Sequence, residues 1–326
     1  MKIEIERKLL LLSENVQAIA KDKSLKWYEG HNLTALLYAQ ENKSIDCQAV
    51  RDCLGLIKAN TKGLSALRGN VSMALAALLS LSDAPETLFG KVVTVYDMLK
   101  AVKLSRSDYL VMAAYLIASR AAASDFQRVV DRTRAFYDGM KEDHVFLTGE
   151  DDHIFAAMLG LSDLDETTGV VRIEQLYQRF KGEFGGKNSV QGLAQVLALG
   201  DEQAAQRVIP LRDAAKARNV RMDKSLVIPM LGLLALLPVR TDAVASELAE
   251  ASDFLRQQKG FGVLSADNKE RVALAAAVVA DEYAAEGAGG VVAATLSSSI
   301  LSILIANQIM MMMIMMSTVT VVAASG

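Results

Sequence analysis

The stretch from Tyr137 to Leu161 combines two of the three histidines of the chain with its densest run of carboxylates. His144 and His153 flank this run, and Asp151 and Asp152 lie directly before an apolar segment. Histidine nitrogens and carboxylate oxygens can transfer protons or bind a divalent metal. One hypothesis is therefore a metal-dependent or acid/base enzyme that uses His144, Asp151 and Asp152. The separation of the histidines (153 − 144 = 9 residues) does not match zinc spacing, so no metal and no cofactor are assigned.

The same residues also have a structural explanation. Thr148 and Asp151 have the spacing of a helix capping box, although Glu or Gln is usual at the second position. Carboxylates in the first turn of a helix are stabilised by its dipole, by ~0.3–1 kcal/mol each. The stretch from Thr148 to His153 is thus predicted to be the turn that enters a helix.

The elements that would position this turn follow a repeating pattern. The chain has only four prolines and is 52% hydrophobic, with apolar residues recurring at three- and four-residue steps, as in helices. Apolar helices alternate with amphipathic ones, and a pair of helices with its turns occupies about 40 residues, as in helical repeat proteins. We predict an all-α fold over residues 1–290, with tandem helical hairpins stacked as an α-solenoid or an α-toroid-like array. An irregular helical bundle is the alternative.

Polar turns precede the apolar helices, and the repeat places these turns on one edge of the array. Asn, Asp, Ser and Thr in such turns satisfy the free N–H groups of a helix N-terminus, which explains their residue types. Their clustering in the first half also predicts a ligand-binding edge, for a small polar ligand or a protein. Its candidate residues are Arg68, Asn70, Arg106, Asp108, His144, Asp151 and Asp152.

Charge and cysteine content limit the partners and the compartment. The formal net charge is −3 and the basic residues are scattered, whereas nucleic-acid binding needs a basic face. We therefore expect no nucleic-acid partner. Cys47 and Cys53 are the only cysteines, and their spacing matches no metal or redox motif. Reduced thiols are expected, together with a cytoplasmic location.

The C-terminal segment, residues 291–326, differs from the rest of the chain. It lacks charged residues, and its Met-rich run from Ile300 to Met316 is just long enough for a membrane span. Asn307 and Gln308 in the middle of the run, and the absence of flanking basic residues, favour a segment packed on the helical array. A tail-anchored membrane protein is the alternative, with membrane contact only through this segment.

Three motifs together resemble a known bacterial family. They are the residues Leu64 to Asn70, the residues Tyr96 to Lys100 with Ser105 to Leu110, and the residues Tyr137 to Asp152. In order and spacing these motifs are similar to the bacterial domain-of-unknown-function 4003 family. The resemblance implies a bacterial cytosolic protein and carries no mechanism. The leading interpretation is a binding or scaffolding module with a polar edge in its N-terminal half.

Overall fold

The structure of the protein is a computed structural model that describes residues 1–62, 65–143, 147–185, 188–224, 227–262 and 268–287. His144 and the C-terminal segment 291–326 lie outside these ranges. The described residues form fourteen α-helices, three short 3-10 helices and no strands. The predicted all-α class and the packing of consecutive helices in pairs are confirmed.

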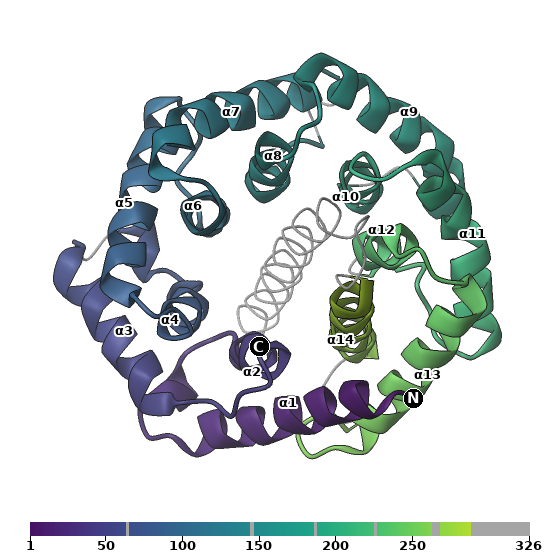
Figure 1. The fold of residues 1–326 in the computed structure, drawn as a ribbon, viewed down its shortest axis with the longest axis horizontal. Coiled ribbons are helices and arrows are strands. Elements are labelled where there is room, and N and C mark those ends of the chain that lie inside the picture. The colour runs from purple at the N-terminus through teal and green to yellow at the C-terminus, as the bar shows by residue number, and fades with distance from the viewer. Residues whose placement is uncertain (63–64, 144–146, 186–187, 225–226, 263–267, 288–326) are drawn as a thin grey trace, which may run out of the picture.

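The odd-numbered helices lie on the outside and the even-numbered helices on the inside (Figure 1). The outer helices are α1 Ile3–Lys21, α3 Cys47–Asn60, α5 Pro85–Ala101, α7 Phe126–Asp143, α9 Glu166–Phe184, α11 Glu202–Ala217 and α13 Thr241–Gln257. The inner helices are α2 His31–Gln40, α4 Ser72–Ser80, α6 Asp108–Arg120, α8 Asp152–Leu161, α10 Asn188–Leu197, α12 Ile228–Leu236 and α14 Asn268–Gly287. The 3-10 helices are η1 Leu25–Trp27, η2 Ala66–Arg68 and η3 Ala123–Asp125.

The two classes of helix follow from the two sequence patterns. Inner helices are buried around most of their circumference, and α6, for example, is buried without a break from Leu110 to Ala118. Outer helices bury a single stripe, which in α3 consists of Val50, Cys53 and Ile57 at steps of three and four residues. A helix that is hydrophobic all round must be enclosed, while one with a polar face can meet water. The alternation therefore decides which helix of each pair lies inside.

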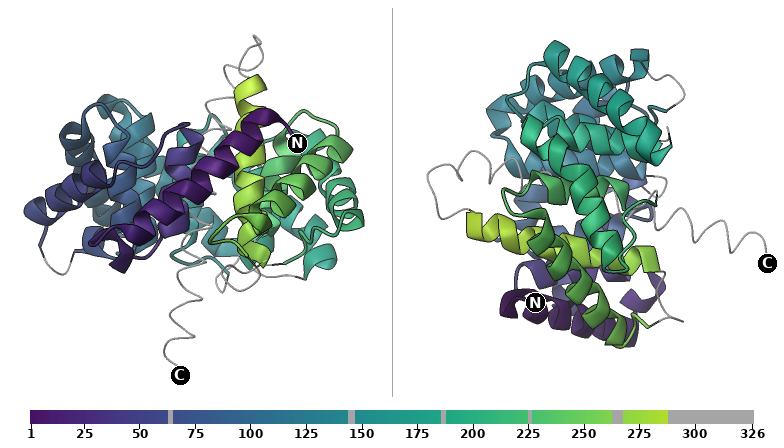
Figure 2. Two further views of the ribbon diagram at one scale, coloured as in Figure 1. Left: turned by 90° about the horizontal axis from the view of Figure 1, so that it is seen from below. Right: turned by 90° about the vertical axis from the view of Figure 1, so that its right-hand side faces the viewer.

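The helix pairs follow one another around a ring (Figure 1). Helices α2, α4 and α6 end at Gln40, Ser80 and Arg120, so the unit repeats every 40 residues there (80 − 40 and 120 − 80). At the junction between the two ends of the ring, α1 packs against α13 and α14. Figure 2 shows α1 crossing α14 from a second direction. The first and last pairs are thus direct neighbours.

An ion-pair cluster joins the two ends of the ring. The buried Lys8 of α1 has its Nζ 2.6 Å from Asp281 Oδ2 and 3.2 Å from Glu282 Oε2, both on α14. Burial acts to lower the pKa of Lys8, but Asp281 and Glu282 outweigh it, and the pKa is raised. The hydroxyl of Ser13 also donates to the backbone oxygen of Lys259, at 3.2 Å. Polar contacts therefore add to the apolar packing at this junction.

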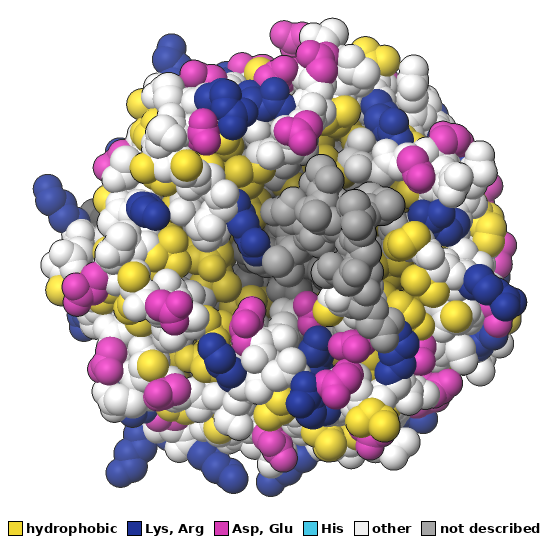
Figure 3. Space-filling model, viewed as in Figure 1, with side chains coloured by type: hydrophobic (Ala, Val, Ile, Leu, Met, Phe, Trp, Pro, Cys, Tyr) yellow, Lys and Arg dark blue, Asp and Glu magenta, His cyan; other side chains and the backbone are white. Residues whose placement is uncertain are grey.

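Charged side chains are mixed on the face of the ring in Figure 3. Lys and Arg are interspersed with Asp and Glu, and hydrophobic side chains are visible between them and toward the centre. None of the helices in the described ranges is long and apolar enough to span a membrane.

Candidate functional site

The polar turns that enter the inner helices lie beside one another at one end of these helices. Four contacts connect neighbouring turns around the ring: Asn32 with Glu270, Asp108 with the backbone N–H of Asn70, Ser107 with His153, and Asp151 with Asn188. The N-terminal ends of neighbouring inner helices are therefore adjacent. We call this end of the helices the polar-turn rim.

The two predicted arginines do not join the carboxylates of Asp151 and Asp152. Arg68 donates from Nε to Thr61 Oγ1 at 2.8 Å, and its Nη2 donates to the backbone oxygens of Lys58 and Thr61. Its guanidinium thus covers the C-terminal end of α3, where free carbonyl groups need donors. Arg106 is exposed and lies near Tyr96, where its charge opposes the rise in the pKa of that phenol caused by burial.

Asp108 contacts the turn before α4. Its carboxylate accepts a hydrogen bond from the N–H of Asn70, and burial raises its pKa. A Cβ atom at Gly69 would collide with this carboxylate, so the close approach requires glycine for lack of space. The side chain of Asn70 is exposed. Asp108 and Asn70 thus meet through the backbone of Asn70.

Asp152 lies in a buried polar cluster between α7, α8 and α10. Its Oδ2 accepts from the N–H of Gly149 at 2.8 Å, and its Oδ1 accepts from Gln195 Nε2 at 2.6 Å and from Gln191 Nε2 at 3.4 Å. Thr148 Oγ1 accepts from Gln191 Nε2 at 2.8 Å. Burial, with the nearby charge of Asp151, raises the pKa of Asp152 to about 7. Asp152 is 2% exposed, so the cluster has almost no access to solvent.

The capping prediction at this turn needs a correction. The hydroxyl of Thr148 donates to the backbone oxygen of Met140 at 3.1 Å and does not cap α8. The carboxylate of Asp152 instead reaches back to the N–H of Gly149. Asp151 is half-buried, accepts a hydrogen bond from Asn188, and has a pKa raised by burial. The glutamines at 191 and 195 were missed, although their four-residue spacing in an apolar helix places both on one face.

His153 is also buried, with 0% exposure. Its ring centroid lies 5.1 Å from that of Tyr137, and Nδ1 lies 3.4 Å from Ser107 Oγ. Burial first, and then the charges of Arg134 and Lys141, lower its pKa to about 4, so the imidazole is neutral at pH 7. Within the described ranges, no three or more His, Cys, Asp or Glu side chains are placed to hold a metal ion.

A cavity of about 440 Å³ lies at the opposite end of α2, α4 and α6. Its wall includes the last turns of these three helices, the first turns of α5, and one residue of α14. Four charged side chains line it, Glu41, Lys91, Arg120 and Asp281, together with four leucines, Leu37, Leu78, Leu81 and Leu88. No signal for this site is visible in the sequence. Arg120 lies at the C-terminal end of a helix, where basic residues are common because they interact favourably with the helix dipole.

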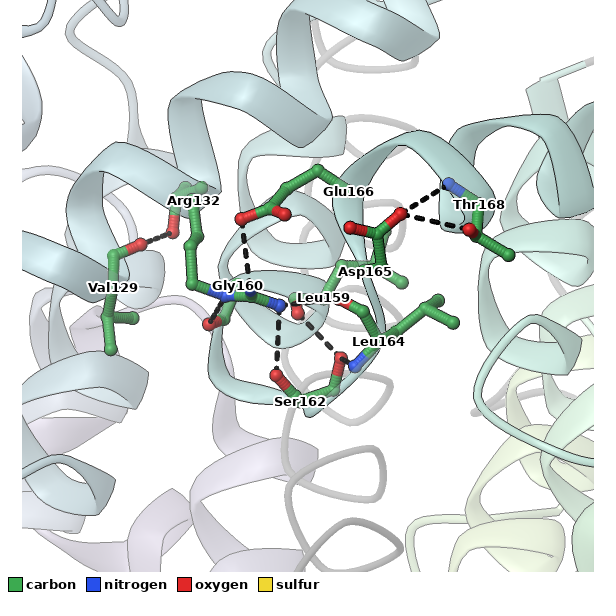
Figure 4. A network of polar contacts seen from close by, with 10 residues as sticks. Val129, Arg132, Leu159, Gly160, Ser162, Leu164, Asp165, Glu166 and Thr168 are labelled. Atoms are coloured by element: carbon green, nitrogen blue, oxygen red, sulfur yellow. Dashed lines mark hydrogen bonds and ion pairs between the residues drawn. The ribbon is translucent and has the colours of Figure 1, made fainter.

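Arginines cover the corresponding helix ends elsewhere in the ring. Arg132 of α7 donates to the backbone oxygens of Gly160, Ser162 and Leu164 and pairs with Glu166 at 2.8 Å (Figure 4). In the next two pairs, Arg172 donates to the backbone oxygen of Gly200 and Arg207 to that of Ala235. Each arginine lies 28 residues before its acceptor, as Arg132 does before Gly160. This recurrence is an internal repeat of a contact: an outer helix caps its own inner helix.

Lys91 occupies the corresponding place in the third pair. It is the seventh residue of α5, as Arg132 is of α7 and Arg172 is of α9. It precedes Ser119, at the end of α6, by the same interval (119 − 91 = 28). In the described part of the chain Lys91 makes no hydrogen bond or ion pair, and it lines the cavity. The cavity therefore lies where three other pairs have an arginine cap.

Several polar groups in the cavity wall lack partners. Among the described residues, Arg120 makes no hydrogen bond or ion pair, and Gln40 Nε2 is buried without an acceptor. The side chain of Arg120 is exposed, yet desolvation by its surroundings lowers its pKa, while Tyr115 and Glu41 act to raise it. Burial also raises the pKa of Tyr115 to about 12, so its phenol stays protonated. The wall thus presents donors that are free to bind a ligand.

Comparison with known proteins agrees with the resemblance seen in the sequence. No curated protein and no solved structure matches the chain. A family profile matches residues 18–310, which is most of the 326 residues, and the resemblance predicted from the three motifs is confirmed. The chain therefore belongs to the family described as "Protein of unknown function (DUF4003)".

Proposed function

We propose that this protein is a binding module that holds a small polar molecule in the cavity between α2, α4, α5 and α6. The observation that carries the proposal is a cavity of about 440 Å³ whose wall contains a guanidinium and a buried amide donor that have no partner among the described residues. Ligand pockets commonly measure roughly 300–1,000 Å³ and combine apolar walls with a few polar groups. A buried donor without an acceptor is unfavourable, so a ligand that accepts its hydrogen bond gains affinity.

The polar-turn rim is the weaker candidate for ligand binding or acid/base chemistry. A carboxyl with a pKa of about 7 suits proton transfer, but the oxygens of Asp152 already accept hydrogen bonds from Gly149 and Gln195. His144, the third member of that hypothesis, lies outside the described residues. The proposal thus keeps the binding interpretation and moves the ligand to the other end of the inner helices.

The proposal also covers the architecture of the protein and its location in the cell. We take the ring to be an α-toroid of seven helical hairpins, in which loops and helix ends are available for binding. The cytoplasm is the proposed location. Its support is that Cys47 and Cys53 are both free thiols and that burial raises both thiol pKa values. Free, unreactive cysteines are usual where the environment is reducing.

A cavity-blocking variant tests the proposal. Thr87 lines the cavity and is exposed, so Thr87→Trp places an indole at its mouth without disturbing the core. Thr94→Trp is the matched control, since Thr94 is exposed on the same helix and does not line the cavity. Melting temperatures of the full-length protein are measured against a library of small polar metabolites.

We expect at least one compound to raise the melting temperature of the wild type and of Thr94→Trp, but not of Thr87→Trp, because a ligand stabilises only the protein that binds it. The proposal is wrong if no compound binds, or if the compounds stabilise Thr87→Trp as strongly as the wild type.

A further inference from the structure

We propose that the cavity between α2, α4, α5 and α6 takes a zwitterionic ligand, an amino acid or a short peptide with an apolar side chain. Arg120 would bind its carboxylate and Glu41 its ammonium group, while the leucines of the wall contact the side chain. This inference rests on the proposed function and names the ligand class of the same site.

Opposite charges line the cavity without pairing with each other. Arg120 and Glu41 are close enough for the charge of Glu41 to act on the pKa of Arg120. Yet neither makes an ion pair or a hydrogen bond among the residues described. Both side chains line one cavity and form no salt bridge with each other, so space remains between them. A molecule with a negative group at one end and a positive group at the other would satisfy both.

The other polar groups of the wall also favour a ligand with both charges. Lys91 and Gln40 Nε2 add donors that lack acceptors in the described structure, and they favour an oxyanion. The C-terminal ends of α2, α4 and α6 contribute the opposite preference, because helix C-termini carry partial negative charge and favour cations. A purely anionic ligand would meet that unfavourable field, and a purely cationic one would meet Arg120 and Lys91.

The position of Lys91 explains why this pair of helices has room for a ligand. In the α7–α8, α9–α10 and α11–α12 pairs, an arginine donates to a carbonyl at the inner helix end. Lysine is shorter and carries one point charge, so it cannot form the branched contacts of a guanidinium. Among the described contacts, no side chain donates to the backbone oxygen of Ser119, the residue that corresponds to Gly160 and Gly200 in the other pairs. That oxygen can accept a hydrogen bond from the ligand's ammonium group.

The apolar part of the wall sets the kind of side chain. Leu37, Leu78, Leu81 and Leu88 come from three different helices and from the loop after α4, and all four line the cavity. Leucine side chains favour an aliphatic group through burial of apolar area. A dipeptide of two leucines carries a carboxylate, an ammonium group and such side chains, which makes it a suitable probe.

Three probes of nearly equal size separate the two charges. They are the dipeptide leucyl-leucine, its N-acetylated form without the positive charge, and its C-terminal amide without the negative charge. Binding to the full-length protein is measured by calorimetry. We expect leucyl-leucine to bind, and each modified form to bind at least about tenfold more weakly, because each leaves one charged group of the wall unpaired.

Two variants assign the charges to residues. Arg120→Gln is expected to reduce the difference in affinity between leucyl-leucine and its amide, and Glu41→Gln to reduce the difference between leucyl-leucine and its N-acetylated form. Arg128→Gln is the matched control, since Arg128 is an exposed arginine of α7 that does not line the cavity, and it should behave as the wild type. Melting temperatures without ligand verify that each variant is folded.

The outcomes distinguish this inference from the proposed function. If the N-acetylated or the amidated form binds as well as leucyl-leucine, the ligand is not recognised as a zwitterion and the inference is overturned. The inference is also overturned if none of the three probes binds but another small molecule does, and if Thr87→Trp abolishes the binding of that molecule. That last result would leave the proposed function intact. Absence of any such binding would overturn both.

Discussion

At the scale of single residues, two neighbours on α8 have pKa values shifted in opposite directions by one cause. Burial disfavours the charged form of any group, so it raises the pKa of the Asp152 carboxyl to about 7 and lowers that of the His153 imidazole to about 4. Near neutral pH the histidine is neutral and the carboxyl is partly protonated. The first turn of α8 therefore carries less charge than its sequence suggests.

Asp152→Asn should change how stability depends on pH. In the folded protein the pKa of Asp152 is about 7, against an ordinary value of 3.8 for an aspartate, so between pH 4 and 7 the folded state holds a proton that the unfolded state has released. Wild-type stability due to this group thus falls as pH rises through that window, by at most about 1.4 kcal/mol per pH unit. Urea unfolding at pH 5 and pH 8 measures the free energy of unfolding of both proteins. The stability of Asp152→Asn relative to the wild type should be greater at pH 8 than at pH 5.

Comparison with the variant isolates Asp152 from its neighbour. His153 contributes in the other direction, since stability due to a base with a lowered pKa is lost as pH falls from 6.5 to about 4. That contribution is present in both proteins and cancels from the difference. Asp163→Asn, at an exposed position, serves as control and should leave the pH profile unchanged. Parallel profiles for wild type and Asp152→Asn would show that the raised pKa is absent.

At the scale of secondary-structure elements, the repeat is held together by contacts as well as by apolar packing. Arg132 of α7 covers the end of α8 and the loop after it, from Gly160 to Leu164 (Figure 4). Free carbonyls at helix ends need donors, and a guanidinium supplies several in one rigid group. The contact fixes where the next outer helix begins, because Arg132 also pairs with Glu166, the first residue of α9.

Arg132→Gln should destabilise the protein by about 2–3 kcal/mol, because it removes hydrogen bonds of a charged donor and leaves carbonyl groups at the end of α8 uncapped. Arg207→Gln should cost less, about 1 kcal/mol, since Arg207 donates only the bond to Ala235 at 2.8 Å among the contacts described. Guanidinium-induced unfolding measures both. Arg128 is exposed on α7 and makes neither of these contacts. The free energy of unfolding of Arg128→Gln should therefore lie within about 0.5 kcal/mol of the wild-type value. Equal losses at 132 and 128 would contradict a capping role.

At the scale of the whole molecule, the contacts of Lys8 join the ends of the chain's helical array. Lys8 belongs to the first outer helix, and Asp281 and Glu282 belong to the last inner helix, so three residues connect segments more than 270 positions apart in sequence. Asp281 also lines the cavity. The junction of the ring and the proposed binding site therefore share a residue.

Lys8→Ala should destabilise the protein by about 3–5 kcal/mol, because removing one partner of a buried ion pair leaves the carboxylates of Asp281 and Glu282 without their cation. Chemical unfolding gives the loss, and limited proteolysis should cleave α1 faster. Lys8→Met combined with Asp281→Asn and Glu282→Gln should recover most of the stability, since no unpaired charge remains. A single variant as stable as the wild type would contradict this role of Lys8.

The fold was predictable wherever local pattern decides it. Apolar runs such as Leu110 to Ala118 and stripes such as Val50, Cys53 and Ile57 identify inner and outer helices, because burial on all sides and burial on one side need different spacings. The polar turns were also placed correctly before the inner helices, since helix N-termini need acceptors. Asp108, Asp151 and Asp152 do lie in these turns, whereas Arg68 is turned toward α3.

The amino-acid sequence alone determined the helical class, the family and the position of the polar turns. Each of these depends on residues close together in the chain. Only the tertiary structure decided that α1 meets α14 through Lys8, that Gln191 and Gln195 enclose Asp152, and that Arg120 shares a cavity with Glu41. These contacts join residues distant in sequence, and their energies depend on burial and on distance. Spacing along one chain carries no record of either.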